Sequence, residues 1–197
     1  MAPDASAHAT SKAVDRTSRE YRWTLDDYHL GIDLGLFEGK RIELIRGKLI
    51  EMSPQSNEHV VATQLAYEAL RAVFGSGYVV RCQLPFTAAD DSEPEPDVSI
   101  VTGAIRDPNP KSKLPLLAVE VSASTLQEDR SSKAELYADS GIADYWILNL
   151  KSRCLEVHRQ PDTDEGRYTQ VTTLQPSDSI APLALPDASV MIADLLP

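Results

Sequence analysis

The sequence predicts a mixed α/β domain, in which helices flank a central β-sheet. Short runs that are apolar, or that alternate between apolar and polar residues, recur along the chain and are typical of strands. Two longer stretches, residues 58–74 and 128–140, have helical patterns and stand between these runs. Clusters of Gly, Pro, Asn and Asp separate the segments. Strands and helices arranged in this order favour a sheet with helices packed against it.

Length and composition limit the classes of protein to which this chain can belong. A chain of 197 residues is long enough to bury a core without disulfides or metal. Residues 1–20 are small and polar without periodicity, so they are predicted to be a disordered tail, and residues 21–197 a single domain. No apolar run approaches the roughly 18 residues of a membrane span, and no secretory signal is visible. We therefore expect a soluble globular protein without a membrane partner.

The charge excludes one class of nucleic-acid protein. The net charge is −11, from 30 acidic and 19 basic residues, whereas a protein that coats DNA is basic because phosphate neutralisation supplies most of its affinity. An enzyme that gathers carboxylates around a cation is compatible with this balance. The two cysteines, Cys82 and Cys154, lie far apart and outside any C-x-x-C pattern. We expect both to be unpaired, packed as small apolar residues, in a protein of the reducing cytoplasm.

The first predicted elements are a short helix and a hairpin. Thr24 can cap the helix, and Asp27, three residues later, can complete a capping box. This helix should end near Gly35 or Gly39. Two β-rich runs then flank Arg46–Gly47, which predicts a hairpin with a two-residue turn.

Residues 58–74 form the clearest helical pattern of the chain. Ser56 or Asn57 can cap this helix, and Gly75 and Gly77 should end it. Its predicted apolar stripe consists of Val61, Leu65, Ala69 and Ala72, with Val60 and Leu70 beside it.

The remaining segments are predicted strands, interrupted by one more helix. Residues 114–121 are almost continuously apolar, which is typical of a strand buried on both faces. Ser124 or Thr125 can cap a helix through residues 128–140, and Gly141 should end it. The other predicted strands are residues 78–86, 97–102, 144–150, 154–160 and 167–174. The prediction is thus a mixed sheet flanked by helices, with an added N-terminal hairpin and C-terminal strands.

Glu120 stands out because it lies inside the apolar run, between Val119 and Val121. A central strand would place its carboxylate within the sheet. An ionised carboxylate that is buried without a partner is costly, so it either takes up a proton or requires a cation. That cation can be a side chain or a metal ion. The alternative is a glutamate near a strand end, paired with a neighbouring base close to solvent.

Two further residues can join Glu120. Asp97 follows a proline and begins a predicted strand, although Pro-Asp is also a common turn pair. Lys133 lies on the predicted helix of residues 128–140, where it can point toward Glu120 or pair with Asp129, four residues earlier. Two carboxylates on adjacent strands can share a hard cation such as Mg²⁺. A lysine beside them can orient a water or stabilise the charge that develops on a phosphate.

Three segments carry a wider pattern: IELIRGKLIEMSP, which contains Glu43, then EPDV, and finally LAVEVSASTLQEDRSSKAELYADSGIADYWIL. Together they resemble the Uma-two family of PD-(D/E)XK proteins, over residues 23–168. The resemblance implies a restriction-endonuclease-like fold and a metal-dependent phosphodiesterase site. It assigns Asp97 and Glu120 as ligands of Mg²⁺ or Mn²⁺ and Glu43 as an additional acid. The lysine expected two residues after Glu120 is a serine here, and the resemblance transfers its role to Lys133.

These observations leave three functional hypotheses. The first is a Mg²⁺- or Mn²⁺-dependent endonuclease that acts on DNA rather than RNA, as a homodimer, with Lys133 assisting the attacking water. The second is a catalytically inactive module of the same fold that binds nucleic acid or a protein partner. The third is a structural protein in which Glu120 is salt-bridged.

Several neighbouring residues have open roles. His59 can touch the site, but a histidine in the first turn of a helix more often packs on a neighbour. Gln83 can line the same cleft or be solvated. Tyr145 and Trp146 open an apolar run, so we expect them in the core rather than stacked on a base. An acidic protein also needs a local basic patch to bind DNA, and the candidates are Arg46, Lys48, Arg81, Arg130 and Lys133.

Overall fold

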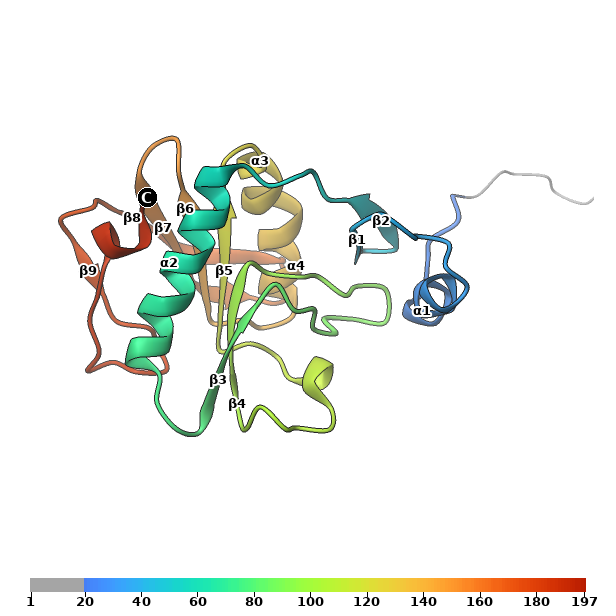
Figure 1. Cartoon of the computed structure of the whole chain (residues 1–197), viewed down its shortest axis with the longest axis horizontal. Coiled ribbons are helices and arrows are strands. Elements are labelled where there is room, and N and C mark those ends of the chain that lie inside the picture. The colour runs from blue at the N-terminus through green and yellow to red at the C-terminus, as the bar shows by residue number, and fades with distance from the viewer. Residues whose placement is uncertain (1–19) are drawn as a thin grey trace, which may run out of the picture.

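A computed structural model describes residues 20–197 of the chain, so the predicted tail lies outside the described residues, apart from its last residue. Figure 1 shows a central sheet between two helical layers. Helix α2, Asn57–Val73, covers one face, and the helices labelled α3 and α4 cover the other. Helix α1, Leu25–Asp33, and the β1–β2 hairpin lie to one side of the sheet.

The sheet has six strands in the order β3-β4-β5-β6-β7-β8. Strands β5 and β6 are parallel, and the other neighbouring pairs are antiparallel. A parallel pair needs a crossover, which here is the helical segment between β5 and β6. The strands are β3 Tyr78–Cys82, β4 Val98–Thr102, β5 Leu117–Ser122, β6 Asp144–Asn149, β7 Cys154–Asp162 and β8 Arg167–Leu174. The predicted mixed α/β class is confirmed.

Two apolar clusters lie on opposite faces of the sheet. Residues Val119 and Val121 of β5 belong to the cluster under α2, whereas Ala118 belongs to the cluster under α4. Every residue of β5 is buried, as its continuous apolar run predicted. Trp146 and Tyr145 are fully buried in the first and second cluster respectively, so the prediction that they lie in the core is confirmed.

The predicted apolar stripe of α2 is partly wrong. Leu70 is fully buried as predicted, but Val61 is 47% exposed, and Ala62 and Ala66 are fully buried in its place. Alanines at these positions let the helix lie close to the sheet, and tertiary packing rather than the helical period decides which face is covered. The cap is as predicted, because the Ser56 hydroxyl accepts a hydrogen bond from the backbone N–H of His59 at 3.2 Å.

The N-terminal elements follow their local sequence signals. Thr24 caps α1, and its hydroxyl accepts from the N–H of Asp27 at 3.1 Å, while the Asp27 carboxylate accepts from the N–H of Thr24. Strands β1, Ile42–Ile45, and β2, Lys48–Glu51, form the predicted hairpin. Its turn residues, Arg46–Gly47, have φ angles of 49° and 72°, which is the pattern of a two-residue hairpin turn.

We expect Gly47→Ala to destabilise the protein more than Gly39→Ala. Both glycines have a left-handed backbone, with φ of 72° and 77°, so an added Cβ strains each by about 1–2 kcal/mol. At Gly47 the new Cβ would also lie 2.7 Å from the Cβ of Arg22, whereas at Gly39 nothing lies within 4 Å. Urea unfolding followed by circular dichroism measures the difference. Equal losses would show that the hairpin turn has room for a side chain.

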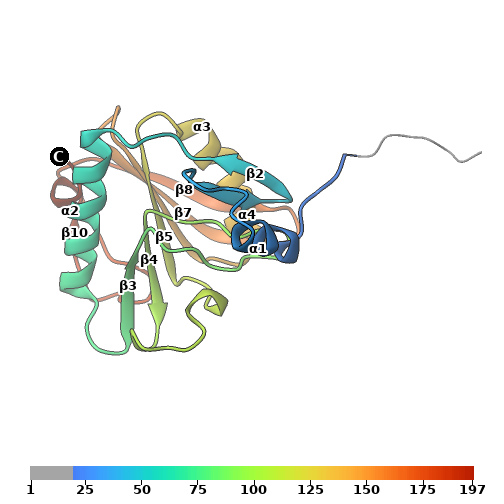
Figure 2. The ribbon, with the colours of Figure 1, turned by 45° about the vertical axis from the view of Figure 1, so that its right-hand side comes forward.

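The C-terminal segment closes the core under α2. Strands β9, Ser179–Ile180, and β10, Val190–Met191, pair with each other, and a 3-10 helix, Ile192–Leu195, follows. Leu196 and the buried residues of this segment join the cluster under α2, and Figure 2 shows the segment beside that helix.

Two further sequence expectations concern thiols and membranes. Cys82 is half-buried, Cys154 is buried, and both are free thiols, as expected. Within residues 20–197, none of the helices combines the length and apolar character that crossing a membrane demands.

Candidate active site

Glu120 lies at the centre of a buried polar site. It stands on β5 with 3% of its surface exposed, so the alternative of a solvated glutamate at a strand end is wrong. Its Oε1 atom accepts hydrogen bonds from Nζ of Lys133 at 3.0 Å and from the hydroxyl of Tyr137 at 2.7 Å. The cation that the sequence required is therefore a side chain in this structure.

Asp97 lies opposite Glu120 across the β4–β5 pair. Val98 pairs with Val119, so the antiparallel register places the preceding Asp97 beside Glu120. Opposed residues of an antiparallel pair point to the same face, and they are about 4.5–5.5 Å apart at Cβ. The Asp97 Oδ2 atom also accepts the backbone N–H of Val121 at 2.8 Å. The two carboxylates that the sequence grouped thus share one face of the sheet.

Glu43 reaches the same site from the hairpin. It stands on β1 and is 3% exposed. Its Oε1 atom accepts the backbone N–H of Glu95 at 2.9 Å and lies 3.5 Å from Nζ of Lys133. One ammonium therefore bridges a hairpin carboxylate and a sheet carboxylate.

Lys133 lies at a break in helical geometry. A continuous helical segment runs through α3, Leu126–Glu128, a π-helical turn, Asp129–Lys133, and α4, Ala134–Asp139. π-Helical turns are rare in proteins, and those that do occur are often found at functional sites. The alternative of an Asp129–Lys133 ion pair is wrong, because the ion pairs of Lys133 within residues 20–197 are with Glu43 and Glu120.

Burial sets the protonation of the central pair. It raises the pKa of the Glu120 carboxyl well above its ordinary value of 4.5, the Lys133 ammonium opposes this effect, and nearby carboxylates add to it. For Lys133, burial alone would lower the pKa, but Glu120 and the surrounding carboxylates outweigh it and raise the pKa. Lys133 therefore keeps its proton at neutral pH, and the site favours added positive charge.

Asp97 is held differently from Glu120. Burial pushes the pKa of Asp97 up, but hydrogen bonding and charge from His59, together with the N–H of Val121, bring it below its ordinary value. Nε2 of His59 lies 2.9 Å from Oδ1 of Asp97, and the side-chain amide of Gln83 donates to the same oxygen at 3.1 Å. Asp97 therefore stays ionised in its buried position.

Sequence reasoning left two members of the site open and missed a third. For His59, contact with the site is the alternative that the structure shows, against the preference for packing on a neighbour, because this residue contacts Asp97 directly. Gln83 contacts Asp97 as well, so it is not simply solvated. The hydroxyl of Tyr137 reaches Glu120, and the available signal was the spacing of four residues between Lys133 and Tyr137 on one helix.

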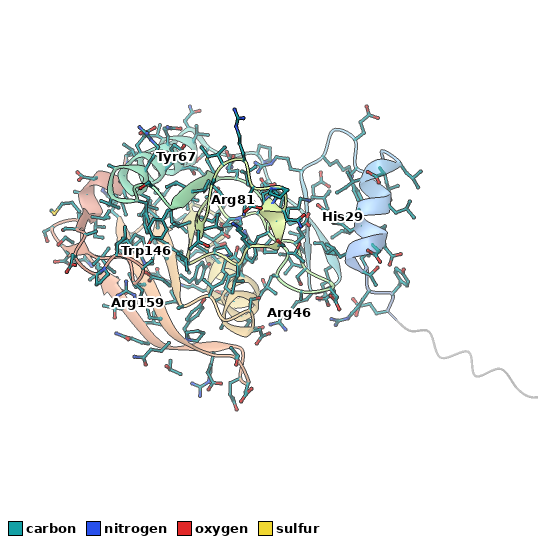
Figure 3. All side chains as sticks on the ribbon, turned by 90° about the horizontal axis from the view of Figure 1, so that it is seen from below. His29, Arg46, Tyr67, Arg81, Trp146 and Arg159 are labelled. Atoms are coloured by element: carbon teal, nitrogen blue, oxygen red, sulfur yellow. The ribbon has the colours of Figure 1, made fainter. Side chains whose placement is uncertain are left out.

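The basic candidates do not gather in one place, since Arg46 and Arg130 line one pocket and Arg81 lines another. Arg46 pairs with Asp139, and Arg130 makes two hydrogen bonds to Glu156, at 2.8 and 2.7 Å. Arg81 is buried and donates to two backbone carbonyls. Figure 3 shows Arg46 and Arg81 on different parts of the fold. The predicted basic residues are thus engaged with partners of the protein itself, with Lys48 exposed on β2.

The donor set suits a hard divalent cation. Among residues 20–197, no three His, Cys, Asp or Glu side chains are grouped so that they could bind an ion by themselves. Mg²⁺ does not require such a group, because it keeps several waters and binds through one or two carboxylates together with phosphate oxygens. Asp97 and Glu120 offer two carboxylates on one face, beside a site that favours positive charge. These residues therefore fit Mg²⁺ or Mn²⁺ in number and chemistry.

The structure is a mixed α/β fold with a buried acidic site. A crystal structure from Anabaena variabilis ATCC 29413, described as "a putative nuclease belonging to DUF820", has a similar fold. The TM-score is 0.67 with 16% sequence identity, and the match covers 88% of this chain and 97% of the other. At this identity the similarity concerns the fold. Among proteins with curated functions, none matches this chain.

The family is shown by the sequence as a whole. A family model named Uma2 and described as "Putative restriction endonuclease" matches residues 25–194. This range includes Glu43, Asp97, Glu120 and Lys133. The chain belongs to the Uma2 family, as the three quoted segments predicted.

Proposed function

We propose that this protein is a Mg²⁺- or Mn²⁺-dependent endonuclease that hydrolyses phosphodiester bonds of DNA. The observation that carries the proposal is the pair of buried carboxylates, Asp97 and Glu120, opposed across two strands beside the Lys133 ammonium. Burial of several acids around one cation carries a high desolvation cost, and groups perturbed in this way cluster at functional sites. The family description, which names a restriction endonuclease, supports DNA over RNA as the substrate.

In the proposed mechanism, each residue has a separate task. Asp97 and Glu120 hold the ion, which when bound would polarise the phosphate and lower the pKa of a water. Lys133 keeps its proton, so it acts as a hydrogen-bond donor that orients the attacking water and faces the charge developing on the phosphate. Glu43 fixes the position of Lys133 from the hairpin side. Tyr137 holds the Glu120 carboxylate in place.

The acidic chain limits how DNA is bound. The net charge of −11 repels a phosphate backbone, and the basic candidates are engaged with protein partners. Neutralisation at the site by the ion and by Lys133 therefore has to supply much of the local attraction. We expect weak binding to DNA without a divalent ion. Cleavage should depend only shallowly on monovalent salt, because few of the basic candidates are free to neutralise phosphates and release their counterions.

A homodimer is the proposed assembly. Strand β8 is one edge of the six-stranded sheet, and its residues 168–174 carry no charge in a strongly acidic chain. An uncharged edge strand is a template for pairing with a second strand. Pairing of two β8 strands about a two-fold axis would place two sites in one particle. Light scattering should then give twice the mass of one chain, which is 21.6 kDa, whereas a particle with the mass of one chain would reject this assembly.

Plasmid cleavage tests the proposed function. Wild-type protein at neutral pH should nick supercoiled DNA with Mg²⁺ or Mn²⁺ and should be inactive with EDTA. Linear DNA, single-stranded DNA and RNA in parallel identify the substrate. Cleavage of RNA alone would reject DNA as the substrate, and cleavage in EDTA would reject the metal. No cleavage of any substrate by the folded protein would favour the inactive binding module.

A further inference from the structure

We propose that His59 and Gln83 are positioning residues, which form a clamp that fixes the Asp97 carboxylate for binding the divalent ion. This inference rests on the proposed function. It concerns neither the carboxylates themselves nor the lysine, but two side chains that reach Asp97 from other elements. We call these two residues the Asp97 clamp.

The clamp converges from two sides of the fold. His59 lies in the first turn of α2, 38 residues before Asp97, and Gln83 follows the last residue of β3. Both side chains bond the same atom, Oδ1, at 2.9 and 3.1 Å. Because an ionised carboxylate only accepts hydrogen bonds, the imidazole Nε2–H and the amide both donate to it. The backbone N–H of Val121 holds the other oxygen.

Three donors on one carboxylate leave it little freedom to rotate. Asp97 is 5% exposed, and the His59 side chain is 15% exposed, so bulk water does not compete fully for these bonds. A metal-binding side chain that is already held in one orientation loses less entropy when it binds the ion. Residues that orient such a side chain without touching the ion therefore raise the metal affinity substantially. Oδ1 accepts two of these hydrogen bonds and Oδ2 accepts one, so the second lone pair of Oδ2 is the one that remains for the ion.

The backbone of Gln83 supports the same interpretation. Its φ is 49°, a left-handed conformation that is uncommon for a residue other than glycine. Its backbone N–H donates to the carbonyl of Asp97 at 3.0 Å, while its side chain bonds the carboxylate. Gln83 thus holds Asp97 through both main chain and side chain. Backbone strain of this kind persists where surrounding contacts fix it, and it clusters at functional sites.

Glu120 provides the contrast. Its Oε1 is held by Lys133 and Tyr137, which come from the helical segment on the α4 face. Within residues 20–197, the side chains that bond the Asp97 carboxylate come from α2 and from the residue that follows β3, not from that segment. The two proposed ligands are therefore oriented by independent sets of residues. Loss of the clamp should weaken ion binding and leave the Glu120 contacts intact.

Isothermal titration with Mn²⁺ on the full chain, without nucleic acid, tests the clamp. Gln83→Met and His59→Phe keep side-chain size but remove the donors, and each should weaken Mn²⁺ affinity by about 10- to 100-fold. His59→Gln retains a donor amide and should recover most of the affinity. In plasmid cleavage, kcat of the two weakened variants should fall, and KM for DNA should stay within a few-fold of wild type.

His29→Phe is the matched control. Nε2 of His29 also bonds a buried carboxylate, Glu93, at 3.0 Å, but within the described residues the other ion pair of Glu93 is with Lys111 and not with Lys133. This variant should bind Mn²⁺ as wild type does, even if it loses stability. Circular dichroism confirms folding of each variant, and Gln83→Met tests the clamp alone if His59→Phe does not fold.

Two outcomes separate this inference from the proposed function. Wild-type Mn²⁺ affinity in both Gln83→Met and His59→Phe would overturn the clamp and leave the proposed function standing. Absence of Mn²⁺ binding by the wild type would overturn the proposed function, and the clamp with it. Failure of His59→Gln to recover affinity would show that the imidazole has a role other than donating this bond, and would overturn its part in the clamp.

Discussion

Glu120→Gln should abolish metal-dependent cleavage while leaving the fold intact. The amide has nearly the size of the carboxylate, and its oxygen can still accept from Lys133 and Tyr137. It cannot neutralise a divalent cation. Loss of several kcal/mol of charge stabilisation corresponds to at least about 10³-fold in rate. Because burial already raises the pKa of Glu120, a neutral side chain should cost little stability. Plasmid cleavage and urea unfolding measure the two effects.

Glu156→Gln is the matched control, because Glu156 is another buried glutamate of the sheet. Glu120 and Glu156 both pair in register with Ile147, on its two sides. Burial pushes the pKa of Glu156 up, but bonds from Arg130 and Asn149 outweigh it and bring the pKa below its ordinary value. Its neutral variant should therefore lose stability but keep cleavage, the reverse of Glu120→Gln. Cleavage at the wild-type rate by Glu120→Gln would exclude Glu120 as a metal ligand.

The sequence predicted those parts of the fold that depend on neighbouring residues. The Thr24 capping box, the Arg46–Gly47 turn and the doubly buried strand β5 each follow from residues within a few positions of one another. Local backbone preferences are strong at such points. They are also short-range, so they say nothing about which elements meet.

The errors arose where contacts with an element far away in the sequence determine which side chains are buried or bonded. The buried face of α2 differs in part from the predicted stripe because Ala62, Ala66 and Leu70 pack on the sheet and on the C-terminal segment, more than 100 residues later. His59 was undervalued because its partner, Asp97, lies 38 residues away and is brought near by α2 and β4. Periodicity shows that a helix has an apolar face, but only the packed structure selects it.

The candidate site was more predictable than the contacts around it. Glu120 was identifiable because a carboxylate inside an apolar strand requires a cation, and Lys133 because the following helix must pack near that strand. The position of Glu43 came from the family resemblance, and the hairpin indeed brings it within 3.5 Å of Lys133. For Gln83 the sequence left two interpretations open, since its left-handed backbone and its contact with Asp97 are not visible in a sequence.

Lys133→Met should cause the largest loss of stability among the site variants, and the loss should grow with pH. Nζ of Lys133 is the ammonium that contacts both Glu43 and Glu120. Removing one partner of a buried ion pair leaves uncompensated charge and costs about 3–5 kcal/mol. Cleavage should be lost as well, because the donor proposed to orient the water is gone. By contrast, Lys40→Met removes only the exposed pair with Glu51, which is worth about 0–1 kcal/mol.

The pH dependence follows from the proton balance of Glu120. Its folded pKa is already raised above the ordinary 4.5, and Lys133 is the group that opposes the rise, so the variant raises it further. Above pH 4.5, folded Lys133→Met then holds a proton that the unfolded chain releases, and its stability falls by up to about 1.4 kcal/mol per pH unit. The wild type loses stability in the same way up to its own folded pKa of Glu120, so the deficit of the variant should stay constant below that pKa and widen above it. Urea unfolding in EDTA at several pH values measures it. A deficit of constant size at every pH would mean that the ammonium of Lys133 does not lower the pKa of Glu120.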